Sequence, residues 1–594
     1  MTIKKSFFDR YGFSLFLIVF AVSMTLKFFP GLENEDAYAG LSYQAIYPDA
    51  MSGDIFYGPQ LKASEAQYRL SAYYLLPKLF GKIWLDDRFV VLLYLLTVVA
   101  AMYFVDRISV VLGAKNIAER ALIMILVLKD NEMLGNKVLL AHHPDFNHSA
   151  LAIPIALWLY YLVLSRKNIF YIFSIALLLA GVSIKNAVFP VASSLIIMSF
   201  TRPAIKDRRL SQLVLLICFF VAVYGVFFLF APPESERLTL WNYLVAEFRK
   251  PGNPFYAFEN SDWYSLGQFS LFLVFSIALL KWPTDNKALY QPVRIVVFMT
   301  LLIWFVASAY ISYAPDFMKF PTLLPFSWNS RALQFPQILM YIALPLMILR
   351  WVDKNPAPIR ILTLIIFLAA LFLVAPKNVP LWFAVLIFSI SLTACGCFFV
   401  WKRNTTKSKF SHWLLINRTS FAAISLSITL AVSLLGTTVK TKIPAWKSLI
   451  EYGVFGDAAS ATWIHVAPWI NANTDPSDPI LTFILQDNGK LKAVRSLATR
   501  TGRPQTKIHR GTRQFDADTW QQRFRQDVIL QSIAKALVTK NYRDLNTLFS
   551  TLIMNPAYLI LPRNLRPPSR TTEFPFILLN TIDNFDIYRK AQKQ

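Results

Sequence analysis

Long apolar runs, separated by short polar segments, fill the first three quarters of this chain of 594 residues. A run of roughly 17–25 apolar residues is long enough to cross the hydrocarbon core of a bilayer as a helix. The pattern predicts about 13 membrane helices, at 13–29, 89–111, 119–134, 149–165, 168–184, 187–200, 210–231, 266–281, 294–313, 331–350, 360–375, 380–401 and 419–438.

The segments between these runs alternate in charge. With the amino terminus inside, seven segments are cytoplasmic, and each contains at least two Lys or Arg: MTIKKSFFDR, AKNIAER, SRKN, TRPAIKDRR, KWPTDNKALYQPVR, RWVDKNPAPIR and WKRNTTKSKFSHWLLINR. The loops on the other side are poorer in these residues and richer in acidic and aromatic ones. This asymmetry follows the positive-inside rule, so we expect a cytoplasmic amino terminus.

The hydropathy changes near residue 439. Residues 440–594 contain no spanning run, and the polar stretch DADTWQQRFRQDVILQSIAKAL predicts a helix. The short apolar segments YLILP, FPFILLN and FDIYRK predict strands. We therefore expect a membrane part at 1–439 and a soluble α/β domain at 440–594 on the outer side of the membrane.

Composition supports the membrane assignment. Hydrophobic residues make up 55% of the chain and charged residues 16%, whereas soluble domains average about 25% charged. The net charge of +25 is explained by the topology signals and does not indicate nucleic acid. The three cysteines, Cys218, Cys395 and Cys397, all lie in apolar runs and form no disulfide framework. The start of the chain resembles a signal peptide without a small-residue cleavage site, which predicts an uncleaved first helix.

The first outer loop, 30–88, begins with an acidic stretch. Glu33, Glu35, Asp36, Asp49 and Asp54 lie where no Lys or Arg occurs between residues 27 and 62. An ionised carboxylate at the membrane surface can accept a proton from a hydroxyl group or hold a divalent cation. The alternative is a solvated acidic loop that caps a helix.

A second polar motif, AHHPDFNHS, precedes the fourth predicted helix. It holds His142, His143, Asp145 and His148, although the whole chain has 6 histidines. Imidazole and carboxylate groups together can bind a metal or a phosphate, or act as acid and base. The alternative is a turn at the membrane interface.

Isolated basic residues form a third set, Lys185, Arg249 and Arg331, all at the outer side. A charge at membrane depth is costly and often marks a substrate path, and these cations suit a lipid phosphate. Snorkelling to a headgroup is the alternative for each. A cationic run from Lys490 to Arg513 in the outer domain would attract an anionic surface, or would simply be solvated.

The arrangement resembles the GT-C superfamily of membrane glycosyltransferases: an acidic first outer loop, a second polar outer motif and a soluble outer carboxy-terminal domain. A narrower similarity to bacterial multi-spanning members rests on EFRKPGNPFYAF, DAASATWIHVAPWINANTDPSDPIL, VRSLATRTGRP and NFDIYRK. The resemblance implies a GT-C-like helical fold in the bacterial inner membrane. It also implies a polyprenyl-phosphate-linked sugar donor, contact with membrane lipids and an acceptor on the outer side.

Carried over to this chain, the resemblance makes Asp36, with Glu35 beside it, the catalytic carboxylate, and makes Asp145 the second acidic position. Lys185 would meet the carrier phosphate and Arg249 would be the loop arginine. The motif EDAY departs from an acid–acid pair around one residue, and Ser-Ile precedes Lys185 where Thr is common. A divalent cation, Mg²⁺ or Mn²⁺, on Asp36 and Asp145 is left open.

Other functions remain open from the sequence. A lipid or glycan transporter or flippase would commonly show internal repeats and charges at the membrane midplane, whereas here the polar groups gather at one side and no repeat is evident. A glycan polymerase or ligase would also place basic outer loops near a lipid pyrophosphate. A non-catalytic scaffold that presents the outer domain to partners is the third alternative.

Overall fold

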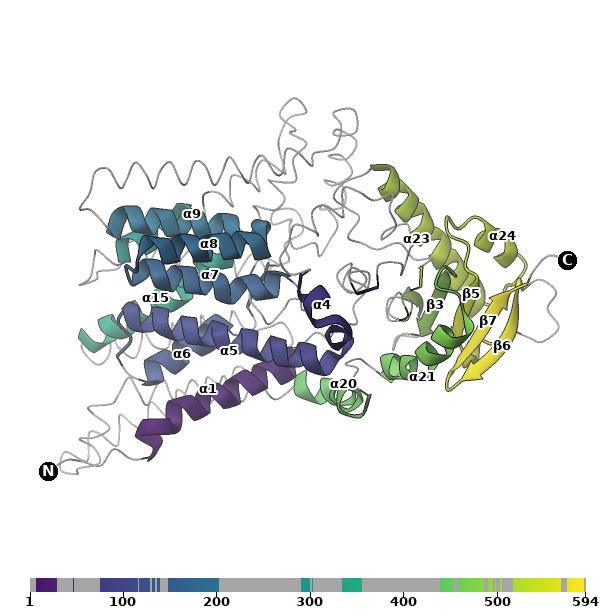
Figure 1. The fold of residues 1–594 in the computed structure, drawn as a ribbon, viewed down its shortest axis with the longest axis horizontal. Coiled ribbons are helices and arrows are strands. Elements are labelled where there is room, and N and C mark those ends of the chain that lie inside the picture. The colour runs from purple at the N-terminus through teal and green to yellow at the C-terminus, as the bar shows by residue number, and fades with distance from the viewer. Residues whose placement is uncertain are drawn as a thin grey trace.

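The computed structural model describes 7–28, 46–47, 75–115, 117–128, 131–133, 136–138, 148–201, 290–299, 302, 334–354, 438–452, 458–485, 490–494, 497, 501, 503–504, 517–567 and 574–591. Within these residues the protein is mostly helical and carries a small mixed sheet (Figure 1). The helices before residue 355 form a bundle, and the sheet lies beyond it along the molecule's long axis.

The bundle combines helices that short connections join with helices that are far apart in the sequence. Its elements are α1 (Phe7–Phe28), α4 (Leu75–Phe80), η2 (Gly81–Leu85), α5 (Asp87–Val111), α6 (Ile117–Leu128), α7 (His148–Leu164), α8 (Ile169–Val182), α9 (Ile184–Thr201) and α15 (Gln334–Lys354). α5 begins where Asp86 caps it, because the Asp86 carboxylate accepts a hydrogen bond of 2.8 Å from the Arg88 backbone N–H. Side chains such as Tyr94, Tyr160 and Leu157 are fully buried in the common core.

Among the described residues, α5 is the one helix with the length and apolar composition of a membrane span. Shorter apolar helical stretches lie at Leu17–Leu26, Ala150–Leu164, Ile169–Val182, Asn186–Ser199 and Ile338–Met347. The core helix of a soluble protein can have the same properties as α5, so a single such helix is weak evidence of a membrane. The number of about 13 membrane helices therefore stays a prediction.

One predicted helix is too long. The run 119–134 was expected to be helical throughout, but α6 ends at Leu128. Beyond it, β1 (Asn131–Met133) pairs with β2 (Asn136–Val138) in an antiparallel hairpin. The segment NEMLGNK explains the difference, because Asn and Gly favour a tight turn over a continuing helix.

α20 (Thr438–Tyr452) follows the last predicted span and packs on the bundle. Its Ala445 and Leu449 belong to the bundle core. The sheet part starts with α21 (Ala458–Asn473), so the first helix of the range 440–594 is attached to the helical bundle.

The sheet has five strands in the order β4-β3-β5-β7-β6. They are β3 (Ile480–Leu485), β4 (Leu491–Val494), β5 (Tyr558–Pro562), β6 (Phe576–Ile582) and β7 (Phe585–Lys590); β3 and β5 are parallel and the other pairs antiparallel. The predicted strands YLILP, FPFILLN and FDIYRK correspond to β5, β6 and β7, while β3 and β4 were not predicted.

Helices cover both faces of this sheet (Figure 1). Leu559 and Leu561 of β5 pack in the cluster with α23 (Ala517–Val538) and α24 (Leu545–Ser550). Tyr558 and Ile560 point to the other face, into the cluster with α21. Alternate residues of β5 thus fill two different cores, which is why YLILP is apolar at every position.

Candidate functional site

Two of the predicted site residues lie in the part of the chain that the structure describes. His148 is the first residue of α7, and Lys185 is the second residue of α9. The other candidates lie outside the described residues: Glu35, Asp36, His142, His143, Asp145, Arg249 and Arg331.

The helices bring the starts of α7 and α9 to the same end of the bundle. The hydroxyls of Tyr160 in α7 and Ser193 in α9 are 2.6 Å apart, and α8 packs against both helices. At about 1.5 Å per residue, Tyr160 is roughly 18 Å from the first residue of α7, and Ser193 roughly 14 Å from that of α9. His148 and Lys185 therefore begin parallel helices at nearly one level.

Three further segments meet at this end of the bundle. The indole Nε1 of Trp446 in α20 donates to the backbone oxygen of Leu26, near the end of α1, at 2.8 Å. The Arg88 guanidinium, at the start of α5, donates to the backbone oxygens of Leu449 and Ile450 at 3.1 and 2.9 Å. These contacts gather segments that the charge pattern assigns to the outer side.

Ion pairs connect the helices at the opposite end. Arg120 of α6 holds the buried carboxylate of Asp106 in α5 with two hydrogen bonds, of 2.5 and 2.6 Å. Arg350 of α15 holds the buried Glu119 and also donates to the backbone oxygen of Gly113. These arginines come from segments with predicted cytoplasmic charges, and their role as partners of buried acids was not predicted.

The segment at residue 290 reaches the same place. The Tyr290 hydroxyl donates a hydrogen bond of 2.6 Å to the backbone oxygen of Leu112, just after α5. Residues 112, 113, 119, 290 and 350, from three segments with the same predicted side, thus lie together. The sequence does carry a signal for this cluster. Asp106 and Glu119 are acids within or next to apolar runs, and such acids usually have a charged partner.

No group of three or more His, Cys, Asp or Glu side chains within the described ranges could hold a metal ion. The two proposed metal ligands, Asp36 and Asp145, are outside those ranges, so the cation stays a prediction.

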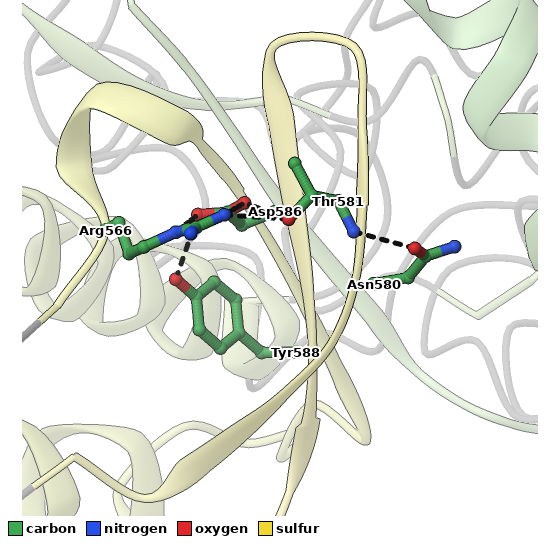
Figure 2. Close-up of polar contacts among 5 residues, drawn as sticks. All are labelled: Arg566, Asn580, Thr581, Asp586 and Tyr588. Atoms are coloured by element: carbon green, nitrogen blue, oxygen red, sulfur yellow. Dashed lines mark hydrogen bonds and ion pairs between the residues drawn. The ribbon is translucent and has the colours of Figure 1, made fainter. Parts of the chain in front are cut away.

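The sheet holds a buried carboxylate that sequence reasoning missed (Figure 2). Asp586 of β7 is 0% exposed and accepts hydrogen bonds from Arg566 Nε at 2.7 Å and from the Thr581 hydroxyl at 2.8 Å. Arg566 Nη2 also donates to Asp586, and the Tyr588 hydroxyl donates at 3.3 Å. Arg566 follows η5 (Arg563–Leu565), so the cluster ties η5 to the β6–β7 hairpin.

The electrostatics of this cluster favour an ionised Asp586. Burial alone would raise the pKa of Asp586, but the hydrogen bonds from Arg566 and Thr581, together with the guanidinium charge, lower the pKa below its usual value. Burial, followed by the charge of Asp586, raises the pKa of Tyr588. Both carboxylate oxygens are occupied, so Asp586 is a structural acceptor and not a base for catalysis.

One member of the cationic run also has a structural role. Arg503 is buried and donates to the side-chain and backbone oxygens of Thr474, at 3.0 and 2.8 Å, and to the backbone oxygen of Thr501. Arg503 therefore stabilises the end of α21 through these hydrogen bonds and is not part of an exposed cationic face.

Comparisons of this chain with protein-family models, with curated proteins and with solved structures found no match.

Proposed function

We propose that this protein is an integral membrane glycosyltransferase that moves a sugar from a polyprenyl-phosphate carrier to an acceptor on the outer side of the bacterial inner membrane. One observation carries the proposal: α7 and α9 begin at the same end of the bundle, with His148 and Lys185 in their first turns. The last turn of α1, which contains Leu26, lies at the same end, and the acidic stretch follows shortly after α1 in the sequence.

The location of these groups fits a donor that is held in the bilayer. A polyprenyl phosphate keeps its chain among the lipids and its phosphate at the surface, so cations at the ends of helices can meet it. Lys185 and Arg249 supply that charge, with Arg331 and His142, His143 and His148 as further phosphate ligands. The acids of residues 33–54 stay uncompensated within the loop because their partners come from outside the chain.

The proposed transfer is a single displacement with inversion. Asp36 accepts the proton of the acceptor hydroxyl, whose oxygen then forms a bond to the anomeric carbon. The bond from that carbon to the carrier phosphate breaks, and the electron pair leaves with the phosphate oxygen. The departing phosphate needs charge stabilisation and no proton, which Lys185 and Arg249 provide. Glu35 and Asp145 align the acceptor.

A divalent cation can be added to this scheme. Asp36 and Asp145 are hard oxygen ligands of the kind that Mg²⁺ and Mn²⁺ prefer, and the bound ion would contribute positive charge near the leaving phosphate. The proposed transfer does not depend on it, since the chain supplies its own cations.

The test is sugar transfer by the full-length protein in lipid nanodiscs, with a radiolabelled polyprenyl-phosphate sugar and a cell-envelope extract as acceptor. We expect label to move from the lipid to the acceptor fraction, and Asp36→Asn to abolish the transfer. Asp54→Asn is the matched control, because it removes the same charge from the same stretch and should leave transfer intact. Full activity of Asp36→Asn at normal expression would refute the role of Asp36.

The same material separates the alternatives. A flippase would carry the labelled lipid across a liposome bilayer without cleaving it. A scaffold would do neither. Movement of intact donor in the absence of transfer would therefore replace the enzyme proposal with transport.

A further inference from the structure

α4 and η2 carry exposed aliphatic and basic side chains close together in the sequence. Leu75, Leu79 and Ile83 recur every four residues and are exposed, with Leu79 at 75%. Lys78 and Lys82 lie one position before Leu79 and Ile83 and are exposed as well. Trp84 points the other way and is completely buried. Residues 75–85 contain no acid, so this segment is both apolar and cationic.

α20 repeats the same pattern. Ile443, Lys447 and Ile450 are exposed and spaced four and three residues apart, which places them on one side of the helix. Ile450 is 75% exposed, while Leu449 is buried against the bundle. The exposed side therefore combines two large aliphatic side chains with a lysine that reaches Glu451 at 3.7 Å.

Arg88 fixes these elements at one level. It is the second residue of α5, close behind η2, and donates to the Leu449 and Ile450 backbone oxygens near the end of α20. Figure 1 shows α4 and α20 at the end of the bundle that faces the sheet. From this level the exposed aliphatic stripe continues along α5 through Leu92, Leu96 and Val99.

We propose that α4, η2 and α20 form a lipid-binding collar in the headgroup region of the outer leaflet. This rests on the membrane location that the proposed function assumes. The aliphatic side chains of the collar enter the acyl boundary, and Lys78, Lys82 and Lys447 bind the phosphates of anionic lipids. Large aliphatic residues interleaved with lysines are the signature of helices that lie in a membrane interface.

A lipid surface explains this pattern better than a protein partner does. The collar is continuous with the exposed stripe of α5, the helix whose length matches a bilayer. Protein interfaces are depleted of lysine, whereas here a lysine stands among the apolar side chains in each of the three elements. The collar would set the depth of the bundle and hold the outer end of α9, where Lys185 lies, at the level of the lipid phosphates.

The experiment measures depth in nanodiscs that contain phosphatidylglycerol. Single cysteines replace Leu79, Ile450, Val99 or Ile577 in a full-length variant whose native Cys218, Cys395 and Cys397 are serines, and each carries an environment-sensitive fluorophore. Lipids brominated near the headgroup end or near the methyl end of the acyl chain then quench the label. Ile577 is the control, because it is an exposed aliphatic residue of the distant sheet.

We expect the labels at 79 and 450 to be quenched chiefly by the shallow bromines, the label at 99 chiefly by the deep ones, and the label at 577 by neither. Quenching at 99 without quenching at 79 and 450 would overturn the collar but leave the membrane location intact. Absence of quenching at 99 as well would overturn both the collar and the membrane location.

The double variant Lys78→Gln, Lys82→Gln tests the role of the lysine charges. In this variant, quenching of the label at 79 should no longer depend on the phosphatidylglycerol content. Arg563→Gln, in the sheet, is the control and should preserve that dependence. An unchanged dependence in the double variant would overturn the phosphate contacts.

Discussion

Arg350 and Glu119 form a bidentate ion pair between α15 and α6, with each terminal guanidinium nitrogen 3.0 Å from a different carboxylate oxygen. Glu119 is 1% exposed, and the pair joins residues 231 positions apart. The same guanidinium reaches the Gly113 backbone oxygen, so it also satisfies a carbonyl group beyond the end of α5. One side chain therefore links three helices at the end of the bundle opposite to His148.

Replacement of Arg350 by methionine should lower the stability of the bundle. The buried carboxylate of Glu119 loses its charged partner, and removal of one member of such a pair costs about 3 kcal/mol. Chemical unfolding in detergent micelles, followed by tryptophan fluorescence, measures the loss. Arg166→Met, which alters an exposed arginine after α7, is the control and should have little effect.

A double-mutant cycle separates the pair from its surroundings. Glu119→Gln combined with Arg350→Met should cost less than the sum of the two single variants, because the second change removes a group whose partner has already gone. Additive costs would show that the two side chains do not interact.

Asp586→Asn should loosen the β6–β7 hairpin. The amide keeps the shape of the side chain but loses the charge that holds Arg566, and hydrogen bonds to charged groups contribute about 2 kcal/mol. Hydrogen exchange of the full-length protein, measured on peptides from 574–591, should be faster in the variant. Asp583→Asn is the control: it lies exposed in the hairpin turn at φ 51°, where asparagine is readily accommodated.

The contribution of Asp586 to the stability of this hairpin should also depend on pH. The folded state lowers the pKa of Asp586, so its stabilising effect is fully present above the unfolded value of about 3.9. The effect is lost as the pH falls through the lower pKa of the folded state. The difference in unfolding free energy between wild type and Asp586→Asn should therefore shrink below about pH 4. A constant difference down to pH 2 would contradict a depressed pKa.

The sequence predicted local elements well and contacts between distant segments poorly. The length of the apolar runs predicted α5, α7, α8 and α9 to within a few residues, because a helix that is apolar on all sides leaves a long uninterrupted run. The short continuous apolar run YLILP predicted β5. The end of α6 was missed because the apolar run was extended across NEMLGN, where turn residues outweigh hydropathy.

Partners far apart in the chain leave no such pattern. Arg120 and Arg350 count equally as topology signals in the sequence, and only the fold reveals that they face Asp106 and Glu119. Arg503 likewise belongs to a cationic run by sequence and to a buried contact with Thr474 by structure. Of the predicted site, the structure describes the backbone positions of His148 and Lys185, and the remaining residues stay predictions.

Lys185→Met should reduce sugar transfer by roughly 100-fold, because removal of one group that stabilises developing charge typically costs that much. The defect should appear in the rate with saturating donor, since the phosphate carries its full charge only as the bond to the sugar breaks. Lys185→Arg should recover part of the rate by restoring a cation. Lys167→Met, a change of the same kind between α7 and α8 at the opposite end of the bundle, is the control and should behave as wild type. Equal losses of activity in Lys185→Met and Lys167→Met would show that the effect comes from folding or membrane insertion. Full activity in both variants would show that the carrier phosphate is bound elsewhere on the protein.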